Sequence, residues 1–170
     1  MSEYLLADEI TEIATRVVEE NAQAGRKVAT AESCTGGLVA GALTEIAGSS
    51  AVLDRGFVTY SNEAKMEALG VAQDIIETFG AVSVACVWAM AQGALERSNA
   101  DVAVAISGVA GPGGGTQLKP VGTVVFARAT RNQHGEPEGE LKFFEGGEGP
   151  GGRASIRRQA TLCALELLLP

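Results

Sequence analysis

The sequence predicts an α/β domain of three layers, in which helices cover both faces of a mixed sheet of about five strands. Three observations carry this prediction. Apolar residues recur at helical spacing near both ends of the chain, short apolar runs of strand composition lie between, and turn or capping residues separate them. The length of 170 residues suits one domain, 1–170, with one substantial core.

The first half of the chain is expected to alternate helix and strand. A helix opens it, because Leu6, Ile10 and Val17 fall on one helical face and Gly25 can end it. The strands expected next are residues 27–31 and 52–60. Each is followed by a turn and a helix, the first ending near Gly48, and the second capped by Ser61 or Asn62 and ending near Gly70.

The second half is expected to complete the sheet. After a short helical piece at 74–79, Ser83 is placed to cap a longer helix. Residues 101–107 form an apolar run typical of a strand buried on both faces. Two strands joined by a polar hairpin, then a last helix, are expected at 121–130, 140–144 and about 153–169. The carboxyl ends of the parallel strands are the expected place for chemistry.

The charge of the chain narrows its partners. A formal net charge of -8 repels phosphate backbones and anionic lipid, so neither nucleic acid nor a membrane surface is expected as a main partner. The segment MSEYLLADEI has neither the basic region nor the apolar core of a signal peptide, and no stretch is apolar enough to span a bilayer. Cys34, Cys86 and Cys163 form no CxxC pair, which argues against a disulfide framework. We expect a cytoplasmic protein, and apolar surface helices favour a homodimer.

The scarcity of histidine excludes several chemistries. His134, the only histidine, lies in a polar hairpin and is expected to be a solvated turn residue. A Ser-His-Asp triad is therefore not expected, nor are the metal sites that use two or three histidines. The acidic residues are scattered along helices and form no metal-binding loop. The sequence predicts no catalytic metal.

A glycine-rich segment, GVAGPGGGT at 108–116, directly follows the apolar run. It lacks the Gly-Lys-Ser/Thr of a P-loop and leads into a strand, so it is neither a Walker A nor a Rossmann motif. It can be a plain wide loop at the sheet edge. We favour the alternative slightly, because glycines after a buried strand permit close backbone approach to a ligand.

Ser33 and Lys65 are the candidate catalytic residues, although each also has a purely structural explanation. Ser33 stands just before a helix whose first amides are unpaired, and such a serine, taken alone, is more often a helix cap than a nucleophile. Lys65, taken alone, would be a solvated helix lysine paired with a nearby Glu. Cys34 is a rival nucleophile, but a small buried cysteine is the simpler account.

Four motifs occur in an order and spacing that resemble the C-terminal domain of the CinA family. They are AESCTGG at 31–37, VTYSNEAK at 58–65, SGVAGPGGGT at 107–116 and KPVGTV at 119–124. The resemblance covers nearly the whole chain. It implies a three-layer α/β/α fold and deamidation of nicotinamide mononucleotide to nicotinic acid mononucleotide and ammonia, without cofactor or metal. The implied catalytic residues are Ser33 as nucleophile, Lys65 in place of histidine, and Tyr60.

The chemistry gives each of these residues a reason. A serine hydroxyl is a weak nucleophile that needs a base, and with histidine excluded a deprotonated lysine amine is available. Lys65 lies in the first turn of its predicted helix, where the helix dipole and partial burial should lower its pKa. Tyr60 is expected to orient Lys65 or to pass a proton. The amides expected to hold the oxyanion are those of Thr35, Gly36 and Gly37.

The substrate phosphate needs a local positive site in an acidic chain. Backbone amides of the glycine-rich segment can cradle it, and an arginine can make a forked contact. The family commonly has Gly-Asp-Arg before the last helix, whereas this chain has EGGEGPGGR at 145–153. Either Arg153 or Arg157 can therefore be the arginine that binds the phosphate. Each can equally be a surface residue of an amphipathic helix. The expected phosphate-binding set is Gly111, Gly113, Gly114, Gly115, Thr116, Arg153 and Arg157.

A second hypothesis belongs to another class of protein. The chain could be a non-catalytic nucleotide-binding or interaction module linked to competence or DNA damage, since the family's name derives from those contexts. Binding of the mononucleotide without product would favour this module. The enzyme hypothesis depends on a contact that sequence does not show, because 32 positions separate Ser33 from Lys65.

Overall fold

The computed structural model describes residues 3–170, so Met1 and Ser2 of the expected domain lie outside the described residues. Its helices are α1 (Asp8–Gln23), α2 (Leu38–Thr44), α3 (Asn62–Leu69), α4 (Gln73–Phe79), α5 (Val84–Glu96) and α6 (Gly152–Leu167), with a short 3-10 turn at Ser49–Ala51. Its strands are β1 (Val28–Glu32), β2 (Leu53–Val58), β3 (Val102–Gly108), β4 (Thr123–Thr130) and β5 (Glu138–Phe143).

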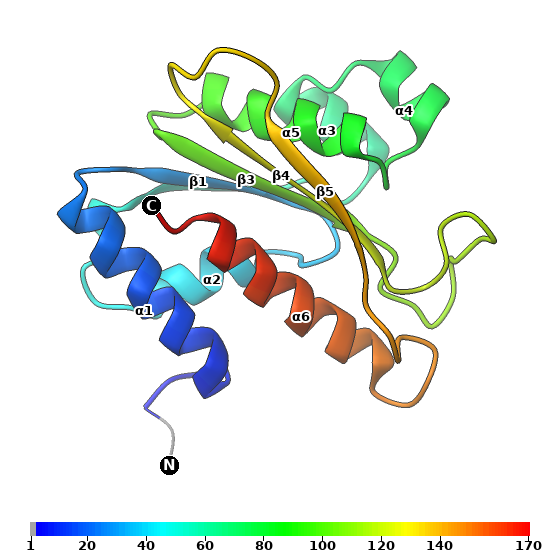
Figure 1. The fold of residues 1–170 in the computed structure, drawn as a ribbon, viewed down its shortest axis with the longest axis horizontal. Coiled ribbons are helices and arrows are strands. Elements are labelled where there is room, and N and C mark those ends of the chain that lie inside the picture. The colour runs from blue at the N-terminus through cyan, green and yellow to red at the C-terminus, as the bar shows by residue number, and fades with distance from the viewer. Residues whose placement is uncertain (1–2) are drawn as a thin grey trace.

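The five strands form one mixed sheet with the order β2-β1-β3-β4-β5. Strand β1 is parallel to both β2 and β3, whereas β4 and β5 are added antiparallel as the hairpin. Helices α1, α2 and α6 cover one face, and α3, α4 and α5 cover the other (Figure 1). The predicted three-layer α/β fold is confirmed. Helix α2 ends at Thr44, before the predicted stop near Gly48. Residues 45–48 form a turn, and Gly48 in the left-handed conformation begins the 3-10 turn instead.

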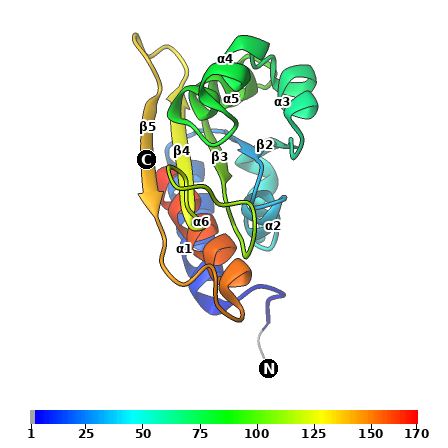
Figure 2. The ribbon, with the colours of Figure 1, turned by 90° about the vertical axis from the view of Figure 1, so that its right-hand side faces the viewer.

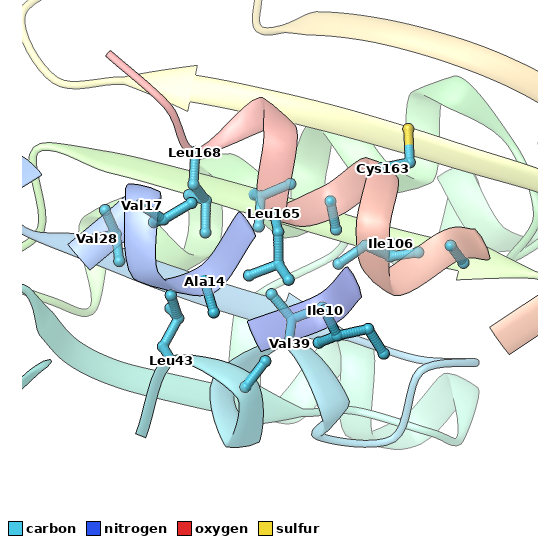
Figure 3. Packing of buried hydrophobic residues seen from close by; sticks show 14 of the residues in the cluster. Ile10, Ala14, Val17, Val28, Val39, Leu43, Ile106, Cys163, Leu165 and Leu168 are labelled. Carbon is cyan, nitrogen blue, oxygen red and sulfur yellow. The ribbon is translucent and has the colours of Figure 1, made fainter. Parts of the chain in front are cut away.

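The two faces of the sheet bury side chains of different size. Branched and aromatic residues such as Val104, Ile106 and Phe126 pack under α1, α2 and α6, and Figure 3 shows this cluster with Ala14 and Leu165. The opposite face carries mostly alanines, which lie at alternate positions of the same strands because successive side chains point to opposite faces. These are Ala29, Ala31, Ala103, Ala105, Ala127 and Ala129.

The alanine face lets helix α5 lie close to the sheet, and α3 lies close to α5 in turn. A Cβ atom added to Gly93 of α5 would stand 1.9 Å from the carbonyl oxygen of Leu69, the last residue of α3. Helix α3 is also held at its ends, since Ser61 caps its start and Gly70 ends it in the left-handed conformation. Both termini were predicted from sequence, and together they fix where α3 begins and ends.

The loops that follow the parallel strands lie together at one end of the sheet. The parallel strands β1, β2 and β3 end there, and the segment 109–122 projects beside the start of α6 (Figures 1 and 2). The hairpin that carries His134 lies elsewhere and exposes this side chain, as predicted. Among residues 3–170, no helix is both long enough and apolar enough to cross a bilayer.

Candidate active site

The turn that carries Ser33 begins where β1 ends. The Ser33 amide donates to the carbonyl oxygen of Ile106 at 2.9 Å, so Ser33 remains paired with β3 although the strand ends at Glu32. Because side chains alternate along a strand, Glu32 points toward the layer of α2 and Ser33 toward the layer of α3. The serine side chain therefore faces the helix that carries Lys65.

Lys65 meets Ser33 directly. Its Nζ atom lies 3.0 Å from Ser33 Oγ and also lies 2.9 Å from the carbonyl oxygen of Thr59 and 3.1 Å from that of Tyr60. Lys65 is 1% exposed and Ser33 7% exposed, so the pair lies almost wholly inside the protein. The contact on which the enzyme hypothesis depends is present.

The surroundings of Lys65 favour its neutral form. Burial lowers the pKa of the Lys65 ammonium, and only ionised thiols of Cys86 and Cys34 would act in the opposite direction. Burial also raises the pKa of Cys34 to about 11, so this thiol stays protonated near neutral pH. A neutral amine has two N–H groups, which the two carbonyls can accept, and one lone pair that is then free to face the Ser33 hydroxyl.

Helix α2 does not offer its first amides to a ligand, because Glu32 already occupies them. The buried Glu32 carboxylate accepts hydrogen bonds from the amides of Gly37, Val39 and Ala40 at 3.2, 2.9 and 3.1 Å. The Gly36 amide donates to the carbonyl oxygen of Ser33 at 3.0 Å. Of the three amides expected to hold an oxyanion, those of Gly36 and Gly37 are thus engaged within the turn.

A pocket of about 280 Å³ opens beside Ser33 and Lys65. Its walls include Ala81 and Val82 from the segment between α4 and α5, which sequence reasoning did not single out. The expected phosphate-binding residues that line it are Gly111, Gly113, Gly114 and Arg153, while Gly115, Thr116 and Arg157 are not among its lining residues.

Arg153, in the first turn of α6, contacts two other segments of the pocket wall. Its guanidinium donates to the carbonyl oxygen of Gly111 at 2.7 Å and to the Tyr60 hydroxyl at 3.1 Å. The Tyr60 hydroxyl therefore contacts Arg153, while it is the Tyr60 backbone carbonyl that contacts Lys65. Tyr60 is 62% exposed and stands at the pocket mouth.

Arg157 lies one helical turn further along α6 and is not among the residues that line the pocket. Its guanidinium donates to the carbonyl oxygens of Cys34 at 3.0 Å and Thr35 at 3.4 Å. The two arginines that sequence left open thus have different surroundings. Arg153 is at the pocket, and Arg157 is against the backbone of the Ser33 turn.

The residue that sequence reasoning missed is Glu32. It is 0% exposed, although it is charged and lies in a strand whose five residues are all buried. A signal for it existed, since a carboxylate ending the apolar run Val28–Glu32 needs buried partners. Among residues 3–170, no group of three or more His, Cys, Asp or Glu side chains is arranged to hold a metal ion.

Fold and site together define a three-layer α/β protein with a buried serine–lysine pair at the carboxyl ends of parallel strands. The model of the CinA C-terminal domain family matches residues 10–170, and the chain belongs to this family. This confirms the family resemblance of the four motifs.

Relatives of the chain carry more specific names. The nicotinamide-nucleotide amidohydrolase PncC of Escherichia coli K12 is 49% identical over 160 residues, which are 94% of this chain and 93% of that protein. A CinA-like protein of Akkermansia muciniphila is 49% identical over 98% of this chain, which spans only 38% of that longer relative. The crystal structure of competence/damage inducible protein CihA from Agrobacterium tumefaciens has a TM-score of 0.87 at 50% identity, covering 99% of this chain and 97% of that one.

Proposed function

We propose that this chain is a nicotinamide-nucleotide amidohydrolase, which converts nicotinamide mononucleotide and water to nicotinic acid mononucleotide and ammonia. The observation that carries the proposal is the 3.0 Å contact between Ser33 Oγ and Lys65 Nζ inside a pocket. The identity of 49% to Escherichia coli PncC, over nearly the full length of both chains, supports this choice of substrate.

In the first step, Ser33 Oγ attacks the carboxamide carbon and the neutral Lys65 amine takes the hydroxyl proton. The carbonyl π bond opens, and its electrons move to the oxygen, which becomes an oxyanion. Within the described residues, the amides of Cys34 and Thr35 donate to no other residue. We assign the Cys34 amide as an oxyanion donor, because Cys34 lines the pocket and the amides of Gly36 and Gly37 are already engaged. Thr35 is 0% exposed and is not among the lining residues.

In the second step, the carbon–nitrogen bond breaks and the Lys65 ammonium returns its proton to the leaving nitrogen, which departs as ammonia. A water molecule then attacks the acyl ester and gives a proton to Lys65. The ester bond breaks and Ser33 recovers a proton from Lys65. The acid that is formed gives its remaining proton to solvent and leaves as the carboxylate. The reaction needs no electron acceptor and no metal in this scheme.

Arg153 is the residue that we assign to the substrate phosphate. It lines the pocket together with the glycine-rich segment, and its side chain supplies positive charge in a chain whose formal charge is -8. The distance between phosphate and carboxamide in the mononucleotide requires one site at each end of the pocket. Arg153 and the segment 109–114 line the same pocket as Ser33 and Lys65, which supports a phosphate site at the former and a carboxamide site at the latter.

We also propose that the chain is one domain that acts as a homodimer in a reducing cytoplasm. Cys34, Cys86 and Cys163 are all buried as free thiols. Leu141 and Phe143 are 56% and 55% exposed on the edge strand β5, where a second copy can cover them. Sedimentation velocity of the purified chain measures its oligomeric state directly.

Ser33→Ala tests the enzyme proposal. We expect ammonia release from nicotinamide mononucleotide to fall at least about 10⁴-fold, because the nucleophile is absent. Ser50→Ala, at an exposed serine, is the matched control and should keep full activity. Undiminished turnover by Ser33→Ala would remove Ser33 from the mechanism. Binding of the mononucleotide by the unmodified chain without product would favour the non-catalytic module.

A further inference from the structure

We propose that Glu32 and Arg157 are positioning residues, which hold the Ser33 turn from opposite sides and keep Ser33 Oγ against Lys65. The inference rests on the proposed function, since it assumes that Ser33 is the nucleophile. It adds two residues that contact neither the pocket nor the lysine. Glu32 accepts hydrogen bonds from N–H groups at the end of the turn, and Arg157 donates hydrogen bonds to C=O groups at its start.

Glu32 accounts for the N–H side. Its carboxylate is 0% exposed and accepts the Thr35 hydroxyl at 2.6 Å in addition to the amides of Gly37, Val39 and Ala40. A buried charge is tolerated only when it is fully hydrogen-bonded, and carboxylate hydrogen bonds are among the stronger ones. These four donors therefore tie residues 35–40 firmly to the end of β1.

The residue that precedes α2 supplies no side-chain cap. This N-cap residue is Gly37, which has no side chain and caps nothing, so Glu32 takes the place that a serine or aspartate cap would fill. The negative charge also lies at the positive end of the helix. Loss of the carboxylate would leave the amides of Val39 and Ala40 buried or half-buried without an acceptor.

Arg157 accounts for the C=O side. It belongs to α6, more than 120 positions later in the chain, and its guanidinium reaches the carbonyl oxygens of Cys34 and Thr35. These are the two residues that follow Ser33, so the contact restrains the backbone directly beside the nucleophile. The Arg157 guanidinium also packs against Gly36, since a Cβ atom there would lie in ordinary contact with it at 3.5 Å.

The two restraints matter because the catalytic contact spans two layers. Lys65 is fixed on α3 on one side of the sheet, while the Ser33 turn leads into α2 on the other side (Figure 1). The Ser33 amide is held by the carbonyl oxygen of Ile106 in β3, but the side-chain contacts that hold the residues after Ser33 come from Glu32 and Arg157. A displacement of about 1 Å in a reacting group can reduce a rate about 100-fold, so a turn held at both polar sides is required for the 3.0 Å contact.

The test uses a reaction that does not depend on the natural substrate. A fluorophosphonate probe labels an activated serine, and mass spectrometry gives the rate at Ser33 between pH 6 and pH 10. We compare the full chain with Glu32→Gln, Glu32→Asp and Arg157→Lys, and we measure deamidation of nicotinamide mononucleotide in parallel. Matched controls are Glu45→Gln, whose carboxylate accepts the Leu5 amide elsewhere, and Arg158→Lys, whose guanidinium pairs with Glu9.

For Glu32→Gln and Arg157→Lys we expect labelling and kcat to fall by about 10-fold to 100-fold with KM changed less than threefold. The labelling profile should also move to higher pH, because a loosened turn admits water to Lys65 and its pKa returns toward the ordinary value. Glu32→Asp should recover part of the rate, since it restores the charge. The controls should match the unmodified chain.

Several outcomes would overturn the inference. Variants that lose thermal stability but, while still folded, label Ser33 at the unmodified rate and pH would show a purely structural role. If Glu32→Gln does not fold, Arg157→Lys with unmodified kinetics decides against the inference. Labelling without deamidation in the unmodified chain would reject the proposed substrate while the variants still test positioning. Absence of both in the unmodified chain rejects both proposals, because Ser33 would then not be activated.

Discussion

Lys65 is among the largest fully buried side chains of the protein, although it is ionisable. A buried amine is costly to keep charged, and it stays neutral in the interior at a pH where a solvated lysine holds its proton. Burial lowers the pKa of Lys65 beside Ser33. In the mechanism that we propose, the stability that is lost at this position is therefore the source of the reactivity.

The lowered pKa of Lys65 predicts how stability changes with pH. Between this lowered pKa and the ordinary value of 10.5, the unfolded chain binds more protons than the folded one, so the free energy of unfolding rises with pH. Lys65→Met has no such group. The unmodified chain should therefore gain stability relative to Lys65→Met from pH 7 to pH 10. Urea denaturation at several pH values measures the difference, and a constant or opposite trend would contradict the neutral base.

The two arginines of α6 give a second prediction at this scale. Arg153→Gln should raise KM for nicotinamide mononucleotide by about 10-fold to 100-fold, the range of one charged hydrogen bond, with a small change in kcat. For nicotinamide riboside, which lacks the phosphate, KM should not change. Arg158→Gln is the control on the same helix. An equal effect of Arg153→Gln on both substrates would exclude a contact with the phosphate.

Among the secondary-structure elements, helix α3 determines where Lys65 lies. Its start and end follow local rules that the sequence displays, a serine cap and a glycine stop. The distance between α3 and β1 does not follow from local rules. It depends on Gly93 in α5, which lies directly against the carbonyl group of Leu69. The position of the base is thus set by a helix that contributes nothing to the chemistry.

Gly93→Ala tests this dependence. The new methyl group would collide with the Leu69 carbonyl, so we expect a loss of about 1–3 kcal/mol in the free energy of unfolding and a lower kcat as α3 is displaced. Gly41→Ala is the matched control, because nothing lies within 4 Å of an added Cβ in α2. It should stabilise the protein by about 0.5–1 kcal/mol. Urea denaturation and ammonia release measure both variants, and equal behaviour would refute the close contact.

Across the whole molecule, the sheet separates two apolar clusters that share its strands. One lies under α1, α2 and α6 and the other under α5. Because Val104 and Ala105 are neighbours in β3 but belong to different clusters, neither cluster can persist without the strand that both require. The molecule is expected to behave as one folding unit despite its two cores.

This predicts a single cooperative unfolding transition. Trp88 packs against the α5 cluster, so its fluorescence follows that side of the sheet, whereas far-UV circular dichroism follows all helices. The two signals should give the same midpoint in urea. Two separate midpoints would indicate that the layers unfold independently and would contradict the prediction of one domain.

Much of the fold and part of the candidate site could be predicted from the sequence. The order of elements, the antiparallel hairpin and the caps at Ser61 and Ser83 follow from local patterns and were confirmed. Ser33 and Lys65 were selected from motifs. The engaged amides of Gly36 and Gly37 were not foreseen. The Gly37 amide is engaged because of where the Glu32 side chain points, and the Gly36 amide because the turn folds back onto the carbonyl oxygen of Ser33.

The sequence by itself determined which residue types exist for chemistry: one exposed histidine, a serine before a short helix and a lysine near the start of another. Local rules act over a few residues, which is why such features can be read from a sequence. Only the tertiary structure decided that Lys65 touches Ser33, that Arg153 faces the pocket while Arg157 faces the turn, and that Glu32 closes α2. These contacts join distant segments, and their distances are set by packing across the sheet, which no local pattern records.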